Sequence, residues 1–119
     1  MLGAFGNSRL LRPDEYRLLE ALLAAAPGLS LQTLKSLRVQ ELNDSGMGSL
    51  RLLPEGLTTK QRVFGAVASE CTFVDADGVE VFATLYLDKD KQLFELDMWK
   101  TDFSPLISIP EKINTCSPA

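Results

Sequence analysis

Two carboxylates stand two residues apart near the end of the chain, and a third follows shortly after them. Side chains alternate along a strand, so Glu95 and Asp97 would share one face, and Asp102 lies close in sequence. Carboxylates at this spacing could act as the acid and base of a glycosidase or hold a divalent metal ion. Such a site needs a concave pocket with further polar groups, so solvated or salt-bridged carboxylates are the favoured interpretation. Three basic residues are candidate partners: Arg51, Arg62 and Lys100.

The sequence contains no histidine, the side chain that most often serves as a general base or metal ligand near neutral pH. Its absence excludes a Ser-His-Asp triad, a Cys-His pair and an HExxH zinc motif. Cys71 falls in an apolar run, where we expect it to pack as an inert thiol. We therefore expect no enzymatic activity and no cofactor or metal, and keep a small metal- or ligand-binding enzyme using Glu95, Asp97 and Asp102 as the alternative.

Two glycine-containing segments resemble ligand-binding loops but lack the spacing that those loops require. Asp75-Ala76-Asp77-Gly78 begins like a calcium loop, yet the later positions of that loop do not follow it. Gly46-Met47-Gly48-Ser49 lacks the lysine of a phosphate-binding loop, and the next segment has the pattern of a strand. Both segments are expected to be turns.

The length of 119 residues predicts one domain, 1–119, with an N-terminal arm over 1–11, a core over 12–103 and an extended tail over 104–119. Residues 1–60 hold seven basic and six acidic side chains, and residues 61–119 hold five basic and ten acidic ones. The acidic second half disfavours nucleic-acid binding. The start of the chain lacks the features of a signal peptide, and no apolar run is long enough to span a membrane. We expect a cytoplasmic protein in which both cysteines are free thiols.

The hydrophobic pattern changes its period along the chain. Residues 13–26 have an apolar stripe at helical spacing, with Pro13 at the first turn and Pro27-Gly28 after the end. From Leu37 onwards apolar and polar side chains alternate, as they do in strands. The expected elements are a helix over 13–26, a short helical turn over 31–35, a β-hairpin of 37–42 with 49–53, and a three-stranded antiparallel meander of 62–74, 79–87 and 92–99. This order predicts an α+β fold in which the N-terminal helix packs on an antiparallel sheet.

The turns of the meander predict its register. A three-residue loop at Ala76-Asp77-Gly78, with glycine in the left-handed conformation, would place Phe73 opposite Val81 and Cys71 opposite Ala83. A turn at Lys89-Asp90 would place Tyr86 opposite Leu93, Thr84 opposite Glu95 and Phe82 opposite Asp97.

This register sorts the side chains of the meander onto two faces. The expected core face carries Val67, Ser69, Cys71, Phe73, Val81, Ala83, Leu85, Leu87, Phe94, Leu96 and Met98. The other face carries Phe64, Phe82, Tyr86, Leu93 and Trp99 together with Glu70, Glu80, Glu95 and Asp97. A solvated face would be polar throughout, whereas aromatic and acidic residues together are typical of an interface. Two explanations are open: residues 103–113 fold back over these aromatics, or a partner binds them.

Three motifs resemble those of a family of small bacterial domains of unknown function. They are Gly46-Met47-Gly48-Ser49-Leu50-Arg51, Asp75-Ala76-Asp77-Gly78-Val79, and the run from Phe94 to Leu106, FELDMWKTDFSPL; the helix opening Arg12-Pro13 adds to them. Some members resemble immunity proteins of polymorphic toxin systems. The resemblance implies a non-enzymatic protein that binds and neutralises a cognate bacterial toxin, and it implies no catalytic residues.

We therefore expect a protein-binding module whose partner is a toxin with a basic surface, and a monomer or weak homodimer in isolation. The expected contact residues lie on the mixed face and the adjoining turn: Asp75, Asp77, Glu80, Phe82, Tyr86, Glu95, Asp97 and Trp99. Reversing the charge of Glu95 and Asp97 is expected to weaken binding and to leave thermal stability nearly unchanged. A homodimeric structural domain, joined through the aromatic face, is a further alternative.

Overall fold

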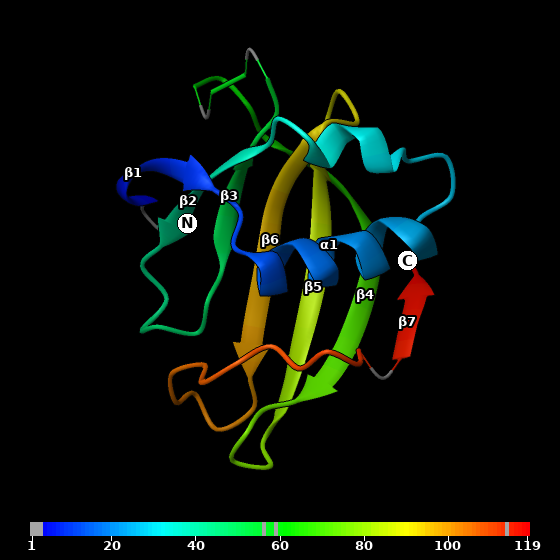
Figure 1. Ribbon diagram of the computed structural model, residues 1–119. Helices are drawn as coiled ribbons and strands as arrows, with labels where there is room; N and C mark the ends of the chain where they lie inside the picture. The colour runs from blue at the N-terminus through cyan, green and yellow to red at the C-terminus, as the bar shows by residue number, and fades with distance from the viewer. Residues whose placement is uncertain (1–3, 56, 59, 114) are drawn as a thin grey trace.

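The computed structural model describes residues 4–55, 57–58, 60–113 and 115–119 (Figure 1). In this part of the chain one α-helix packs on a seven-stranded antiparallel sheet, so the predicted α+β class is confirmed. The elements are β1 (Ala4–Leu10), α1 (Pro13–Ala25), the 3₁₀ turn η1 (Leu31–Leu34), β2 (Arg38–Leu42), β3 (Leu50–Leu53), β4 (Phe64–Val74), β5 (Glu80–Asp88), β6 (Leu93–Lys100) and β7 (Thr115–Pro118). The strand order across the sheet is β1-β2-β3-β6-β5-β4-β7.

Helix α1 forms where the sequence predicts it. Pro13 suits the first turn, and the Glu15 carboxylate accepts the backbone N–H of Arg12 at 2.8 Å, which satisfies a donor at the open end of the helix. Leu18, Leu19, Leu22 and Leu23 are buried against the sheet. Burying one leucine contributes about 2 kcal/mol, so this stripe holds the helix on the sheet.

The two predicted β-units join into one sheet through β3 and β6. Residues Leu50 and Arg51 of the hairpin lie opposite Leu96 and Glu95 of the meander. The outermost strands were not expected: part of the predicted arm forms β1, which pairs with β2, and part of the predicted tail forms β7, which pairs with β4. Neither segment shows a clear alternation of apolar and polar residues, so periodicity did not indicate a strand at either place. Residues 1–3 of the predicted arm lie outside the described residues.

The register of the first hairpin of the meander is confirmed. Phe73 lies opposite Val81 and Cys71 opposite Ala83. Gly78 has a φ of 83°, and the Asp75 N–H donates to the Val79 carbonyl at 2.9 Å, as the expected three-residue loop requires.

The register of the second hairpin was predicted wrongly by two residues. Glu95 lies opposite Tyr86, Asp97 opposite Thr84 and Trp99 opposite Phe82. The turn is longer than expected, with Lys91 at a φ of 64° and the Asp88 N–H donating to the Gln92 carbonyl at 2.9 Å. A shift by two keeps the facing of most side chains, because the period of a strand is two.

Two bulges change the facing of individual residues. The shift between Tyr86 and Leu87 inserts Phe94 as an extra residue in β6, so Leu93 joins the core cluster and Phe94 does not, opposite to the prediction. The shift between Val67 and Ser69 places Val67 opposite Tyr86, where it is partly exposed rather than in the expected core.

The C-terminal tail crosses the same face of the sheet as α1. Figure 1 shows its chain passing in front of β5 and β4, below the helix. Ile109 belongs to the buried core, and Leu106 and Ile113 pack against it. Phe103, the residue directly before the tail, lies on the opposite face beside Trp99. The tail therefore does not fold back over the aromatics of the other face.

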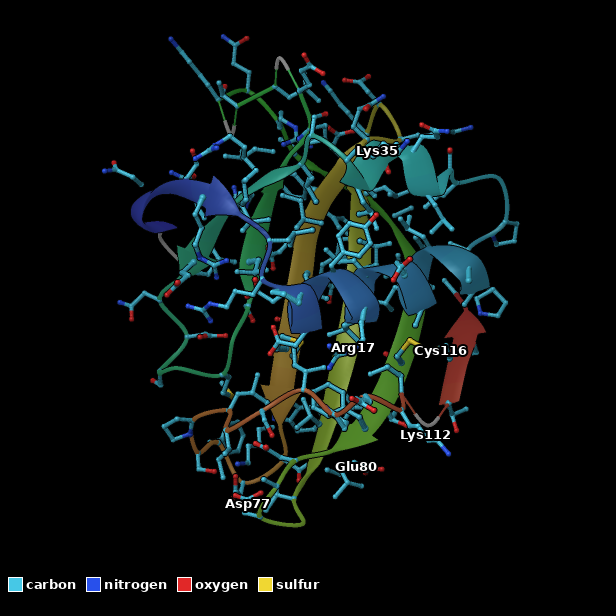
Figure 2. The ribbon with its side chains drawn as sticks, in the orientation of Figure 1. Arg17, Lys35, Asp77, Glu80, Lys112 and Cys116 are labelled. Atoms are coloured by element: carbon cyan, nitrogen blue, oxygen red, sulfur yellow. A yellow bond between two sulfur atoms is a disulfide. The ribbon has the colours of Figure 1, made fainter. Side chains whose placement is uncertain are left out.

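A disulfide joins Cys71 of β4 to Cys116 of β7, where two free thiols had been expected. The two residues lie directly opposite each other in the register, with their Cα atoms 4.0 Å apart, and Figure 2 labels Cys116 on the short edge strand. The prediction failed because it treated the tail as coil, and only the pairing of β7 with β4 brings these residues together.

Candidate functional site

The side of the sheet that points away from α1, here called the outer face, carries most of the predicted contact residues in three cross-strand rows. The first row is Arg51, Glu95, Tyr86 and Val67; the second is Asp97, Thr84, Glu70 and Ser117; the third is Trp99, Phe82, Thr72 and Thr115. Bringing strands β3 to β7 together places these side chains on one surface.

The first row is electrically balanced within the molecule. Arg51 is buried, and its Nη2 lies 3.5 Å from Glu95 Oε1, so Arg51 is the partner of Glu95 among the three candidates. The Arg51 guanidinium also lies 4.9 Å from the centre of the Phe94 ring. Burial raises the pKa of Glu95, Arg51 opposes this rise and Asp97 adds to it. The ion pair means that reversing the charge of Glu95 would leave Arg51 against another cation, so the expectation of unchanged stability does not extend to this residue.

The other two candidate partners of Glu95, which are Arg62 and Lys100, form ion pairs with other carboxylates. Arg62 Nε lies 2.9 Å from Asp88 Oδ2, and its guanidinium lies 5.2 Å from the centre of the Phe94 ring. Lys100 points to the opposite side of the sheet, where its Nζ lies 2.9 Å from Asp75 Oδ2.

The second row holds two carboxylates, Glu70 and Asp97, that form no ion pair with any residue the structure describes. Asp97 is half-buried, and among the described residues none forms a hydrogen bond or ion pair with its carboxylate. Burial raises the pKa of Asp97, and the nearby carboxylate of Asp44 adds to the rise. Thr84 Oγ1 donates to Glu70 Oε2 at 3.2 Å, which satisfies one oxygen of Glu70 but supplies no positive charge. This row is therefore a strip of uncompensated negative charge.

The third row contains an aromatic patch, which consists of Phe82, Trp99 and the neighbouring Phe103. The rings of Phe82 and Trp99 stack with their centres 5.4 Å apart, and Phe103 lies beyond Trp99 at 6.3 Å. Trp99 is 43% exposed and Phe103 is 66% exposed. Phe64 and Tyr86 form a second, edge-to-face pair at 5.5 Å. Both pairs leave apolar surface open to solvent beside the carboxylates.

The acidic residues of the turn expected at the edge of this surface differ in their exposure to solvent. Asp77 and Glu80 are exposed, and both are labelled near the tip of the sheet in Figure 2. Asp77 Oδ2 also lies 2.7 Å from Lys100 Nζ. Asp75 is buried, which removes it from the expected set of contact residues.

Asp75 instead ties the C-terminal tail to the sheet. Its carboxylate accepts hydrogen bonds from Lys100 Nζ and from the backbone N–H groups of Ile107 at 2.8 Å, Ser108 at 3.0 Å and Ala76 at 2.6 Å. Burial by itself would raise the pKa of Asp75, but these hydrogen bonds outweigh it and lower the pKa to about 2. The sequence contains one signal that the partner of Asp75 is buried. Lys100 continues the alternation of the buried Leu96 and Met98, so it occupies a core position.

The three carboxylates of the enzyme alternative do not form a common site. Asp102 accepts the hydroxyl of Ser104 at 2.6 Å and its N–H at 3.0 Å, in a local turn. In the described part of the chain, no group of three or more His, Cys, Asp or Glu side chains could hold a metal ion.

A polar hollow of about 190 Å³ lies away from these carboxylates, between the start of α1, the 43–49 turn and the tail. Its charged groups bind one another: Arg9 Nη1 and Nη2 donate to the two Glu15 oxygens at 2.8 and 2.9 Å. A Cβ at Gly48, which has a φ of 98°, would lie 3.0 Å from Leu106 Cδ2. The glycine is therefore needed for a turn and for the close approach of the tail.

Together these features define a small α+β domain with an open face that is both acidic and aromatic. Residues 8–110 match the family described as a domain of unknown function (DUF6984), and the chain belongs to this family. The resemblance to a family of unknown function is thus confirmed at that level. No curated protein and no solved structure matches the chain. Within the described residues, no helix is long and apolar enough to cross a membrane.

Proposed function

We propose that this protein is a non-enzymatic protein-binding module, an immunity protein whose outer face binds and neutralises a cognate bacterial toxin with a basic surface. The observation that carries the proposal is the uncovered outer face, where exposed aromatic rings adjoin the carboxylates of Glu70 and Asp97, which pair with no cation among the described residues.

The aromatic patch of Phe82, Trp99 and Phe103 would supply most of the affinity for the partner. Large aromatic side chains dominate the binding energy of many interfaces, because they bury much apolar area at low cost in side-chain entropy. Trp99 and Phe103 are exposed although the tail could have covered them, and the tail instead packs beside α1.

The carboxylates would select the partner. Glu70, Asp97 and the exposed Glu80 add negative potential to the outer face, and the second half of the chain carries ten acidic against five basic residues. Such a surface speeds encounter with a basic partner and disfavours acidic ones, nucleic acid included. It also disfavours a homodimer joined through this face, because two copies would bring like charges together. We infer that the protein acts as a monomer. The predicted cytoplasmic location is not carried into this proposal, because it assumed two free thiols and the Cys71–Cys116 disulfide is typical of an oxidising compartment.

The immunity role rests on the resemblance stated from the sequence motifs. A neutralising protein needs a stable scaffold and a complementary surface but no chemistry, which agrees with a chain that lacks histidine.

Co-expression of this protein with the tagged product of the adjacent reading frame tests the proposal. We expect the two to co-purify as a stoichiometric complex that blocks the toxicity of the partner. Trp99→Ala should abolish co-purification. Ile107→Ala removes an apolar side chain of the tail that is more exposed than Trp99, 61% against 43%, and should leave co-purification intact. Absence of a complex, or equal binding by both variants, would overturn the proposal.

A further inference from the structure

We infer that the outer face binds an arginine side chain of its partner, with the guanidinium paired to Asp97 and stacked on Trp99. The inference rests on the proposed function for the existence of a protein partner, and it adds the chemistry of the central contact.

The molecule contains its own example of this contact. Arg51 lies beside β6 with its guanidinium 3.5 Å from the Glu95 carboxylate and 4.9 Å from the centre of the Phe94 ring. A carboxylate and a ring on β6 thus hold one guanidinium at the first row. Two residues further along β6, Asp97 repeats the carboxylate, and Trp99 supplies an exposed ring on the same face.

In the part of the chain that the structure describes, the neighbouring strand brings no cation to Asp97. Strand β3 begins at Leu50, opposite Leu96, so it supplies Arg51 to Glu95 and no side chain to Asp97. The hydroxyl of Ser49, the preceding residue, accepts the Met98 N–H at 2.9 Å and so bonds with the β6 backbone. On the other side of Asp97, the Thr84 hydroxyl donates to Glu70. Asp97 thus remains without a donor among the residues that the structure describes.

The surroundings of Asp97 favour a cation as its ligand. A half-buried carboxylate has lost part of its hydration, so its attraction for a cation is less screened than at a fully exposed site. Burial raises the pKa of Asp97, and the nearby carboxylate of Asp44 adds negative potential that raises it further.

Arginine fits this place better than lysine. Its planar guanidinium can pair with a carboxylate and stack on an aromatic face at the same time, and it is more weakly hydrated than an ammonium group. Asp97 and Trp99 are separated by about 6.6 Å along the strand, a span that one arginine side chain bridges.

The chain offers a direct spectroscopic test, because Trp99 is its one tryptophan. The probes are a hexa-arginine and a hexa-lysine peptide, both with blocked ends, which carry equal charge. Titration of hexa-arginine into the full-length protein should change the fluorescence of Trp99 saturably, with a Kd about fivefold lower than that of hexa-lysine.

A pair of variants separates a specific contact from general attraction. Asp97→Asn should raise the Kd for hexa-arginine about fivefold. Asp90→Asn removes the same charge from the exposed β5–β6 turn, at the other end of β6 from Trp99, and should leave the Kd unchanged. Equal binding of both peptides, or equal effects of both substitutions, would overturn the inference.

This outcome is distinguishable from failure of the proposed function. Peptide binding that needs Asp97, without a complex with the adjacent gene product, would remove the proposed partner and retain the arginine contact. A toxin complex that is unchanged by Asp97→Asn would retain the function and remove the arginine contact.

Discussion

Lys100 Nζ lies 2.9 Å from Asp75 Oδ2, and both side chains are fully shielded from solvent. The contact joins the end of β6 to the β4–β5 turn, and the same carboxylate holds the tail through Ile107 and Ser108. A residue that sequence patterning placed on a binding surface is therefore a structural link between the sheet and the C-terminal segment.

Replacing this carboxylate tests the link. Asp75→Asn should lower the free energy of unfolding by about 3 kcal/mol, because it removes a charge that pairs with buried Lys100. Urea denaturation near neutral pH measures the change. The matched control is Asp90→Asn in an exposed turn, which should alter stability by less than about 0.5 kcal/mol. Equal stability of the two variants would show that the link contributes nothing.

The same carboxylate should make stability depend on pH. The folded state lowers the pKa of Asp75 from 3.8 to about 2, so its contribution is present above the unfolded pKa and is lost as the pH falls through the folded pKa. The stability difference between wild type and Asp75→Asn should therefore be constant above about pH 5 and shrink towards pH 2. Denaturation curves of both proteins across this range measure it. A difference that stays constant down to the lowest pH would contradict the lowered pKa.

The Cys71–Cys116 disulfide should stabilise the fold by closing a loop with a sequence separation of 45 residues. The chain-entropy model gives about 4 kcal/mol for a loop of this length. Denaturation with and without a reducing agent measures the effect, and the double variant Cys71→Ala, Cys116→Ala should show no dependence on the reductant. Complete alkylation of both thiols in the unreduced native protein would show that the bond is not formed.

The two carboxylates predicted to act together on the outer face should behave differently. Glu95→Lys places a cation against the buried Arg51 and should lower the free energy of unfolding by about 2 kcal/mol. Asp97→Lys breaks no ion pair with a described residue and relieves repulsion from Asp44, so it should leave stability within about 0.5 kcal/mol of wild type while it weakens partner binding. Thermal denaturation together with co-purification compares them. Equal loss of stability in both variants would contradict the assignment of Arg51 to Glu95.

Much of the sheet was predictable because its patterns are local. Gly78 and the loop before it predict the register of the first hairpin correctly, since a turn type limits the pairing of its flanking strands. The register of the second hairpin was predicted wrongly for two reasons. Lys91 adopts a positive φ although it is not glycine, and the alternation of side chains does not reveal the extra residue Phe94 in β6.

The candidate surface was predictable in its members but not in its electrostatics. Alternation along β5 and β6 was enough to place Phe82, Tyr86, Glu95, Asp97 and Trp99 on one face. The pairing of Arg51 with Glu95 depends on β3 lying beside β6, a contact between segments more than forty residues apart in sequence. Alternation also could not show that Asp75, at the end of a strand, is enclosed by the tail.

Local sequence patterns specify the α+β class, helix α1, the five central strands and the mixed character of the outer face. Each of these follows from apolar periodicity and turn chemistry within about ten residues. Three features are visible only in the folded molecule: β1 and β7 extend the sheet, Cys71 bonds to Cys116, and the tail packs on the side of the sheet that carries α1. These features depend on contacts between residues far apart in sequence. The same long-range contacts leave Trp99 partly exposed and leave Asp97 without an ion-pair partner among the described residues.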